Sequence, residues 1–448
     1  MVLLVLLSAV PARAQSAQSQ PPGPARPFRG LFGGNEADPR SRQALNLQAS
    51  FFSAYDDNVL ADRGQGGVPD PRYMTSGFYA GATTSLDYRR RWGRVSFDLS
   101  GGTLLRYYPS MSDFNSASEW ASAGFSAALT RKTTLRASQG VSYSPFYSYG
   151  WFAGLNPTVT GEVVRPNSDY VVYKRPLFES TTAVDLARRV TRRSSLNFFY
   201  NLNRADFRQS ADVSDPTLTE GYKTQNAGAR FSYSATSRTS LRFGYSYQAS
   251  RYGALVLRNQ QIEGHNVEIG FEYARAFVRD RTTTFGVSTG GSVTDSPYNP
   301  YLINAANTSY YYNVPVDAYL EHPFGRAWNA RLSYTRNLQF VEGLTEPFFS
   351  NAATATLRGY VGRRVYLTTS AAYSNGTGIY SSLGRGITAY TGTVQSQFAL
   401  SRTTALFAQY FYYHYEIDGR LLAPPGPTQR FDRQGIRAGL SFWLPLLR

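Results

Sequence analysis

Hydrophobic and polar residues alternate along much of the chain. The segment 241–248 reads Leu-Arg-Phe-Gly-Tyr-Ser-Tyr-Gln, so that every second side chain is apolar and the side chains between them are polar or absent. A period of two is typical of a β-strand with one apolar face and one polar face. The same alternation recurs at 95–100, 196–201 and 266–273. We therefore predict an all-β protein with half-apolar strands.

Short links that carry arginine recur at a spacing of about 45 residues, as expected for a repeated hairpin. Between them lie pairs of alternating segments of about 10 to 14 residues, joined at the other end by longer and more varied loops. Eight tight turns and nine long loops make eighteen strands, with both chain ends on the turn side. The eight turns are 90–93, 130–133, 191–194, 235–238, 279–281, 323–326, 362–364 and 401–403.

This asymmetry of short turns and long loops is typical of bacterial outer-membrane proteins. We predict that residues 43–448 form a transmembrane antiparallel β-barrel of about 18 strands, with short periplasmic turns and longer extracellular loops. The protein would then be integral to the outer membrane, with both termini in the periplasm. A barrel of this size is too wide for side chains to fill and should enclose an aqueous channel.

The N-terminal part of the chain has a different composition. Residues 1–10 are apolar and too short to span a membrane, and Ala12-Arg13-Ala14 follows as a site for signal peptidase, which predicts a signal peptide over 1–14. Because no basic region precedes the apolar run, we expect that the true translation start lies upstream. Residues 15–42 are rich in Pro, Gly, Ala and Gln and predict a flexible periplasmic segment.

The last strand carries a further pattern. Gly439 stands two positions after the polar residue Arg437, and Phe442 and Leu444 stand three and five positions after Gly439. This pattern resembles the C-terminal signal by which outer-membrane proteins are recognised for insertion. The resemblance implies the barrel assembly machinery as a partner.

Composition excludes several classes of protein. The 448 residues contain no cysteine and three histidines, which rules out thiolate chemistry and leaves little for a catalytic base or a transition-metal site. We predict no enzymatic activity, no cofactor and no metal. A mean hydropathy of −0.36 excludes a helical membrane protein. The formal net charge is +16, but the arginines are scattered instead of forming a patch, which favours anionic lipid or cargo over nucleic acid as partners.

Charged residues in the polar register of the strands are predicted to line the lumen. Because arginine outnumbers the acids in this set, the channel should favour anions; alternatively, the arginines pair with the acids and brace the wall. The predicted lining residues are Arg106, Arg136, Arg230, Arg242, Arg331, Arg358, Arg437, Asp98, Glu268 and Glu272, with Asp185 and Asp317 among the further inward acids.

The longest loop, residues 145–176, is rich in aromatic side chains that must be buried somewhere. We predict that it folds into the barrel mouth and forms a constriction with Tyr147, Tyr149, Trp151 and Phe152. Packing outward against a partner or another subunit is the alternative.

The stretch Tyr55-Asp56-Asp57-Asn58-Val59 ends the first predicted strand. Its oxygens suit either a divalent cation or, with better precedent, a turn capped by Asx side chains. With the arginine-bearing hairpins and the terminal Leu440–Pro445 stretch, it resembles outer-membrane β-barrel proteins associated with bacterial exopolysaccharide biosynthesis and export systems.

That resemblance implies a non-enzymatic channel that takes part in exporting polysaccharide cargo, with a periplasmic polysaccharide-export protein as a partner besides outer-membrane lipid. A general or sugar-selective diffusion porin is the nearest alternative with the same fold. A structural or adhesive surface barrel with a blocked lumen is the second alternative.

Overall fold

The structure is a computed structural model that describes residues 42–58, 76–110, 115–145, 176–207, 221–252, 260–278, 281–296, 309–325, 327–339, 348–378, 386–417 and 430–447. The described residues form strands and the turns between them. The strands are β1 (Gln43–Asp56), β2 (Gly77–Trp92), β3 (Val95–Tyr107), β4 (Ser116–Ala128), β5 (Thr133–Ser144), β6 (Leu177–Arg189), β7 (Ser194–Phe207), β8 (Gly221–Ser234), β9 (Thr239–Tyr252), β10 (Gln260–Val278), β11 (Arg281–Ser296), β12 (Ser309–Asn313), β13 (Val316–Phe324), β14 (Trp328–Gln339), β15 (Phe348–Val361), β16 (Val365–Gly378), β17 (Gly386–Ala399), β18 (Thr404–Ile417) and β19 (Arg430–Leu447).

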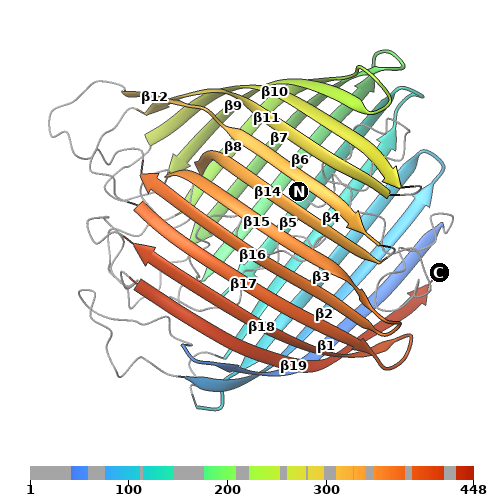
Figure 1. The fold of residues 1–448 in the computed structure, drawn as a ribbon, viewed down its shortest axis with the longest axis vertical. Helices are drawn as coiled ribbons and strands as arrows, with labels where there is room; N and C mark the ends of the chain where they lie inside the picture. The colour runs from blue at the N-terminus through green and yellow to red at the C-terminus, as the bar shows by residue number, and fades with distance from the viewer. Residues whose placement is uncertain are drawn as a thin grey trace.

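Apart from β12 and β13, which do not pair with each other, each strand pairs with its sequence neighbours in antiparallel register, and β1 also pairs with β19, so the sheet closes on itself (Figure 1). The short strands β12 and β13 both pair with β11 and together occupy one position in the barrel. They are separated at Pro315, which has no N–H to donate to a strand ladder. The barrel therefore has eighteen strand positions, which confirms the predicted fold.

The two faces of the sheet differ as the alternation predicts. Large hydrophobic side chains stand exposed on one face, including Phe78, Leu332 and Ile436, while polar side chains of the neighbouring positions are half-buried on the other face. The exposed apolar face is the outer one, because a membrane-spanning barrel presents its apolar band to lipid and its polar side chains to the interior. Tyr410 and Tyr412 lie on this face, whereas Phe411 and Tyr413 are buried on the inner face.

The tight turns follow two local designs. In four of them a hydroxyl caps the turn: the side-chain oxygens of Thr130, Thr191, Thr236 and Ser401 each accept the backbone N–H two residues on, at 3.1 Å. The residue in between is exposed at the tip of each turn. In three others a glycine with positive φ makes the turn, namely Gly93, Gly325 and Gly362.

The joint between β1 and β19 depends on Gly439. Phe52 of β1 and Phe407 of β18 flank this glycine on either side, and their rings meet edge to face at 6.4 Å. A Cβ at position 439 would lie 2.0 Å from the backbone oxygen of Phe51. Glycine is therefore required here for the first and last strands to approach closely, whatever its part in recognition for insertion.

Candidate functional site: the charged inner face

A belt of charged side chains runs around the inner face, in the half of the barrel nearer the turns. We call it the charge belt: its ion pairs are Arg89–Asp98, Arg136–Asp185, Arg230 and Arg242 with Glu268, and Arg331–Glu321. These residues belong to strands between β2 and β14, and most lie within a few residues of a tight turn. The turns and the strand register therefore bring together charges that are far apart in sequence.

The pairs on β2 to β7 are formed between adjacent strands. Arg89 Nε donates to Asp98 Oδ1 at 2.6 Å, directly across the β2–β3 hairpin. Arg136 lies opposite Asp185 in the ladder, with 3.6 Å between Nη1 and Oδ1. Asn197 of β7 donates to the other oxygen of Asp185 at 2.6 Å. Both acids thus have a fixed partner.

Glu268 is the centre of the belt. Arg242 Nη2 lies 2.7 Å from one of its carboxylate oxygens and Arg230 Nη2 lies 3.5 Å from the other. Arg230 also stacks over the ring of Phe199, with its guanidinium carbon 5.5 Å from the ring centroid. Two cations from β8 and β9 thus share one carboxylate from β10, and the arrangement fixes all three side chains.

The belt continues on β13 and β14. The hydroxyl of Tyr319 donates to Glu272 at 2.6 Å, and Arg331 stacks on the ring of Tyr319 at 4.9 Å. Arg331 also pairs with Glu321, which accepts a further hydrogen bond from Asn329 at 3.1 Å. Asp317, on the same face, precedes this group.

The charge belt is only partly buried. The side chains of Arg230, Glu268 and Arg331 retain 36%, 29% and 34% of their exposure although they point into the barrel. Water therefore reaches the inner face at this level, and an ion pair keeps much of its hydration.

Nearer the loops, at the joint of β1 and β19, lies a second group that we call the seam cluster: Asp56, Asp57, Asn58, Arg433 and Gln434. Arg433 Nε donates to both oxygens of Asp56, at 2.9 and 2.8 Å, and Nη2 donates to Oδ2 as well. The two side chains are 1% and 0% exposed. This is a buried bidentate pair between the first and last strands.

The rest of the seam cluster extends the joint beyond the ladder. Asn58 N donates to Asp56 Oδ1 at 3.0 Å, which closes an Asx turn, and its side-chain amide donates to the carbonyl of Asp432 at 2.9 Å. Asp57 and Gln434 exchange two hydrogen bonds. Of the two roles considered for the Asp-Asp-Asn stretch, the structure shows the capped turn, with an ion pair in addition.

Two predicted lining arginines lie beside the seam cluster. Arg437 Nε donates to Gln409 at 2.5 Å and stacks over Phe52. Arg106 is buried and stacks over Tyr79. These aromatic contacts belong to a small inner core formed by Phe52, Ala54, Tyr79 and Tyr108.

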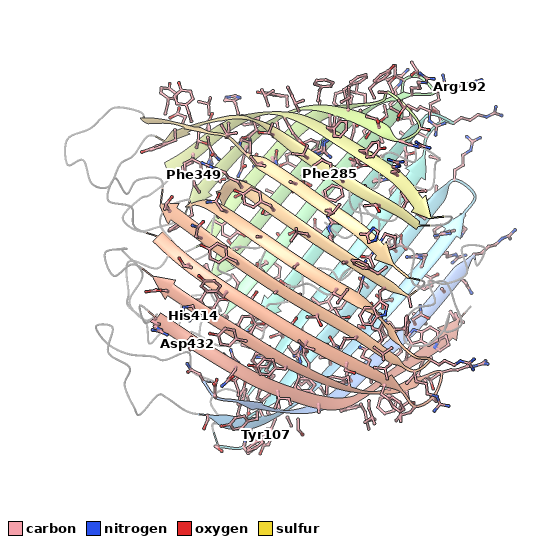
Figure 2. The ribbon with its side chains drawn as sticks, viewed as in Figure 1. Tyr107, Arg192, Phe285, Phe349, His414 and Asp432 are labelled. Atoms are coloured by element: carbon pink, nitrogen blue, oxygen red, sulfur yellow. The ribbon has the colours of Figure 1, made fainter. Side chains whose placement is uncertain are left out.

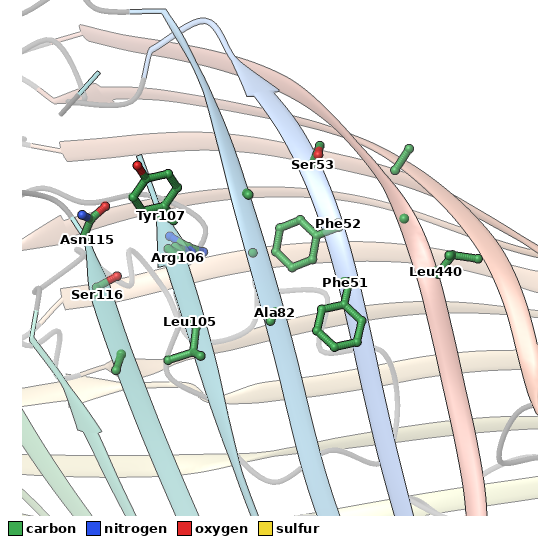
Figure 3. A pocket seen from close by; sticks show the side chains of 15 residues that line it. Phe51, Phe52, Ser53, Ala82, Leu105, Arg106, Tyr107, Asn115, Ser116 and Leu440 are labelled. Atoms are coloured by element: carbon green, nitrogen blue, oxygen red, sulfur yellow. The ribbon is translucent and has the colours of Figure 1, made fainter. Parts of the chain in front are cut away.

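A hollow of about 740 Å³ borders the same region (Figure 3). Phe51, Leu105 and Tyr107 stand on the near side of the strands in this view, while Phe52 and Arg106 lie behind them. Residues of both registers line the hollow, such as Phe51 with Phe52 and Leu105 with Arg106, so it is not a chamber of the inner face alone. We therefore base the candidate site on the inner face and not on this hollow.

His414 and Asp432 form a separate pair on the outer face at the loop end (Figure 2), with 2.5 Å between Nδ1 and Oδ1. Arg430 pairs with the same carboxylate at 3.2 Å, and the ring of Tyr390 lies 5.7 Å from the imidazole. These contacts place His414 among the polar and aromatic side chains at the loop end of the outer face. The described residues hold no group of three or more His, Cys, Asp or Glu side chains that could bind a metal ion.

All the predicted lining residues lie on the inner register, and all except Arg358 belong either to the charge belt or to the region of the seam cluster. Arg136, Arg230, Arg242 and Arg331 are paired with acids, as the bracing alternative has it. Arg358 follows on β15, opposite Asn329. Sequence reasoning missed Arg433, Glu321 and Tyr319, although each stands in the polar register of its strand.

The remaining predictions fall on other parts of the chain. Tyr147, Tyr149, Trp151 and Phe152 lie outside the described residues, as do the signal peptide and almost all of the segment 15–42. Phe442 and Leu444 lie on the outer face of β19, where Phe442 meets Phe51 edge to face at 6.3 Å. Among the described residues no helix is both long and apolar enough to cross a membrane.

Comparison with known proteins gives a likeness in fold only. No family model matches the chain, and no curated protein does. Among solved structures, Pseudomonas aeruginosa OpdQ matches at 12% identity over 90% of this chain and 98% of its own, with a TM-score of 0.45. Acinetobacter baumannii OccAB4 matches at 10% identity over 91% and 100%, with a TM-score of 0.44. The outer membrane protein opdK of P. aeruginosa matches at 12% over 90% and 98%, with a TM-score of 0.42.

Proposed function

We propose that this protein is a non-enzymatic channel of the outer membrane through which small hydrophilic solutes diffuse. The observation that supports this most directly is the partly exposed charge belt inside a closed barrel of eighteen strand positions. In a dry interior, desolvation would cost several kcal/mol for each charged group of these pairs. A barrel this wide also leaves space along its axis that side chains do not fill.

The belt fixes what kind of passage the channel offers. Its arginines are held by carboxylates, so the lining presents alternating charge in fixed positions instead of one uniform sign. Such a lining attracts polar and zwitterionic solutes and gives a modest preference for anions where arginines predominate, near Arg106 and Arg437. Anion preference remains a prediction.

Export of exopolysaccharide, which the sequence resemblance implies, gains no support from the comparisons: none of the three proteins named above is named for it. The Asp-Asp-Asn stretch that contributed to the resemblance serves to join β1 to β19. The polysaccharide-export partner and the assembly machinery stay predictions.

Liposome swelling tests the proposal. Purified protein reconstituted into vesicles should admit sugars of increasing size up to a cut-off, at rates that depend on solute size and little on stereochemistry. Vesicles with heat-denatured protein serve as the control. If the folded barrel admits no sugar, the protein is a structural or adhesive barrel with a blocked lumen; if it also admits long oligosaccharides without a size cut-off, export is the better account.

A further inference from the structure

Among the described residues, exposed basic side chains gather at the turn end of the barrel. The exposed basic residues of the turns form a group that we call the turn-end ring: Arg94, Arg131, Lys132, Arg192, Arg193, Arg238, Arg363, Arg364 and Arg402. The turn residues that the structure describes, 93–94, 129–132, 190–193, 235–238, 325, 327, 362–364 and 400–403, include no carboxylate. Figure 2 shows Arg192 projecting from this end.

The charge belt does not account for the formal charge of +16, because its arginines face carboxylates. The turn-end ring differs in this respect. Like charges gathered at one end of a molecule repel one another, and they are tolerated best where an anionic surface meets them.

The turns are built to present these cations. In each hydroxyl-capped turn the first residue binds the backbone beyond it, as Thr191 does to Arg193 N at 3.1 Å and to Ser194 N at 3.0 Å. The two residues at the tip then point away from the barrel. The same geometry places basic residues at the tips that follow Thr130, Thr236 and Ser401. One local design thus repeats the same presentation around the barrel.

The positions of the ring members around the barrel indicate what kind of surface binds them. Its members come from six turns, which join β2–β3, β4–β5, β6–β7, β8–β9, β15–β16 and β17–β18, and so lie along most of the circumference of the barrel. A docked protein would select one side. Lipid headgroups meet every side, and the ring lies directly next to the outer apolar face, where Arg90 stacks on the exposed Trp92 at 4.4 Å.

We propose that the turn-end ring binds the headgroups of anionic phospholipids, such as phosphatidylglycerol, in the leaflet at the turn end. If the turns are periplasmic, as proposed above, this is the inner leaflet of the outer membrane. Each arginine offers several N–H donors to a phosphate, and a basic residue next to an anionic leaflet gains attraction that salt screens within a Debye length.

Native mass spectrometry of the intact barrel, released from micelles with equal amounts of phosphatidylglycerol and phosphatidylcholine, tests the proposal. We expect phosphatidylglycerol to be retained preferentially. The variant R131Q/R192Q/R238Q/R402Q keeps every capping hydroxyl and should lower the affinity of the affected sites about fivefold each. The corresponding Arg→Lys variant should retain most of the binding, because its charge is unchanged.

The matched control removes the same charge from the other end. Arg204, Arg251, Arg336 and Arg430 are exposed on the outer face near the loops, and R204Q/R251Q/R336Q/R430Q should leave most of the phosphatidylglycerol bound. Equal losses in the two glutamine variants, or no preference in the wild type, would overturn the assignment. Sugar permeation is measured with the same variants. Because neither set of residues lies in the lumen, permeation should stay unchanged, so that a failure of the lipid proposal can be told apart from a failure of the channel proposal.

Discussion

The pair Asp56–Arg433 should contribute more to the stability of the barrel than any exposed ion pair on it. Replacing Arg433 by Met removes three N–H···O contacts. The Asp56 carboxylate, which is 0% exposed, then remains buried without a cation beside it. Breaking a buried pair in this way costs about 3–5 kcal/mol. Asp56→Asn should cost a similar amount, because it leaves the guanidinium buried without its counter-charge.

Equilibrium urea unfolding in short-chain phosphatidylcholine vesicles, followed by tryptophan fluorescence, measures this free energy. The double variant Asp56→Leu with Arg433→Met should be far more stable than the sum of the single variants implies, since an apolar replacement of both partners is often neutral. Arg430→Met is the matched control: its pair with Asp432 is 71% and 47% exposed, so the loss should stay below about 1 kcal/mol. The reasoning is refuted if Arg433→Met costs no more than this control, or if the two single losses simply add.

Three further predictions concern the wall and the lumen. Gly439→Val should lower the free energy of unfolding by at least about 1–3 kcal/mol, because the added side chain overpacks against β1, and it should reduce the heat-modifiable fraction on gels. Gly291→Ala is the control and should change neither quantity, because a Cβ there meets nothing within 4 Å. Glu268→Gln removes one negative charge from beside Arg230 and Arg242; at about 8 Å in water this is worth about 0.5 kcal/mol with opposite sign for an anion and a cation, so the anion-to-cation permeability ratio, measured by reversal potential, should rise about fivefold, with the outward-facing Glu416→Gln as control. Deleting residues 149–164 should raise single-channel conductance if the predicted constriction loop lies in the mouth, and unchanged conductance in a folded barrel would place that loop elsewhere.

The sequence predicted the architecture well, because the alternation of apolar and polar residues within each strand shows which side chains belong to each of its two faces. Alternation in segments such as 241–248 identifies the strands, and the arginine-bearing turns separate the hairpins, so the count of eighteen followed without any knowledge of long-range pairing. The division of one strand at Pro315 was missed, since a proline near a strand end also suits a loop.

Partner choice inside the barrel was not readable in this way. Register determines that Arg136 faces Asp185 or that Glu268 lies between two arginines, and register depends on the lengths of all the turns in between. The role of Asp56 shows the same limit: the stretch around it was conspicuous, but its partner Arg433 lies 377 positions away.

The central claim, an open channel lined by the charge belt, is tested most directly by single-channel recording in planar bilayers. Purified, heat-modifiable protein should insert in discrete steps of ohmic conductance that scale with bulk salt conductivity, as expected for a water-filled lumen. Correctly folded barrels that insert but carry no measurable current would contradict the account, and would assign the charge belt to bracing the wall alone.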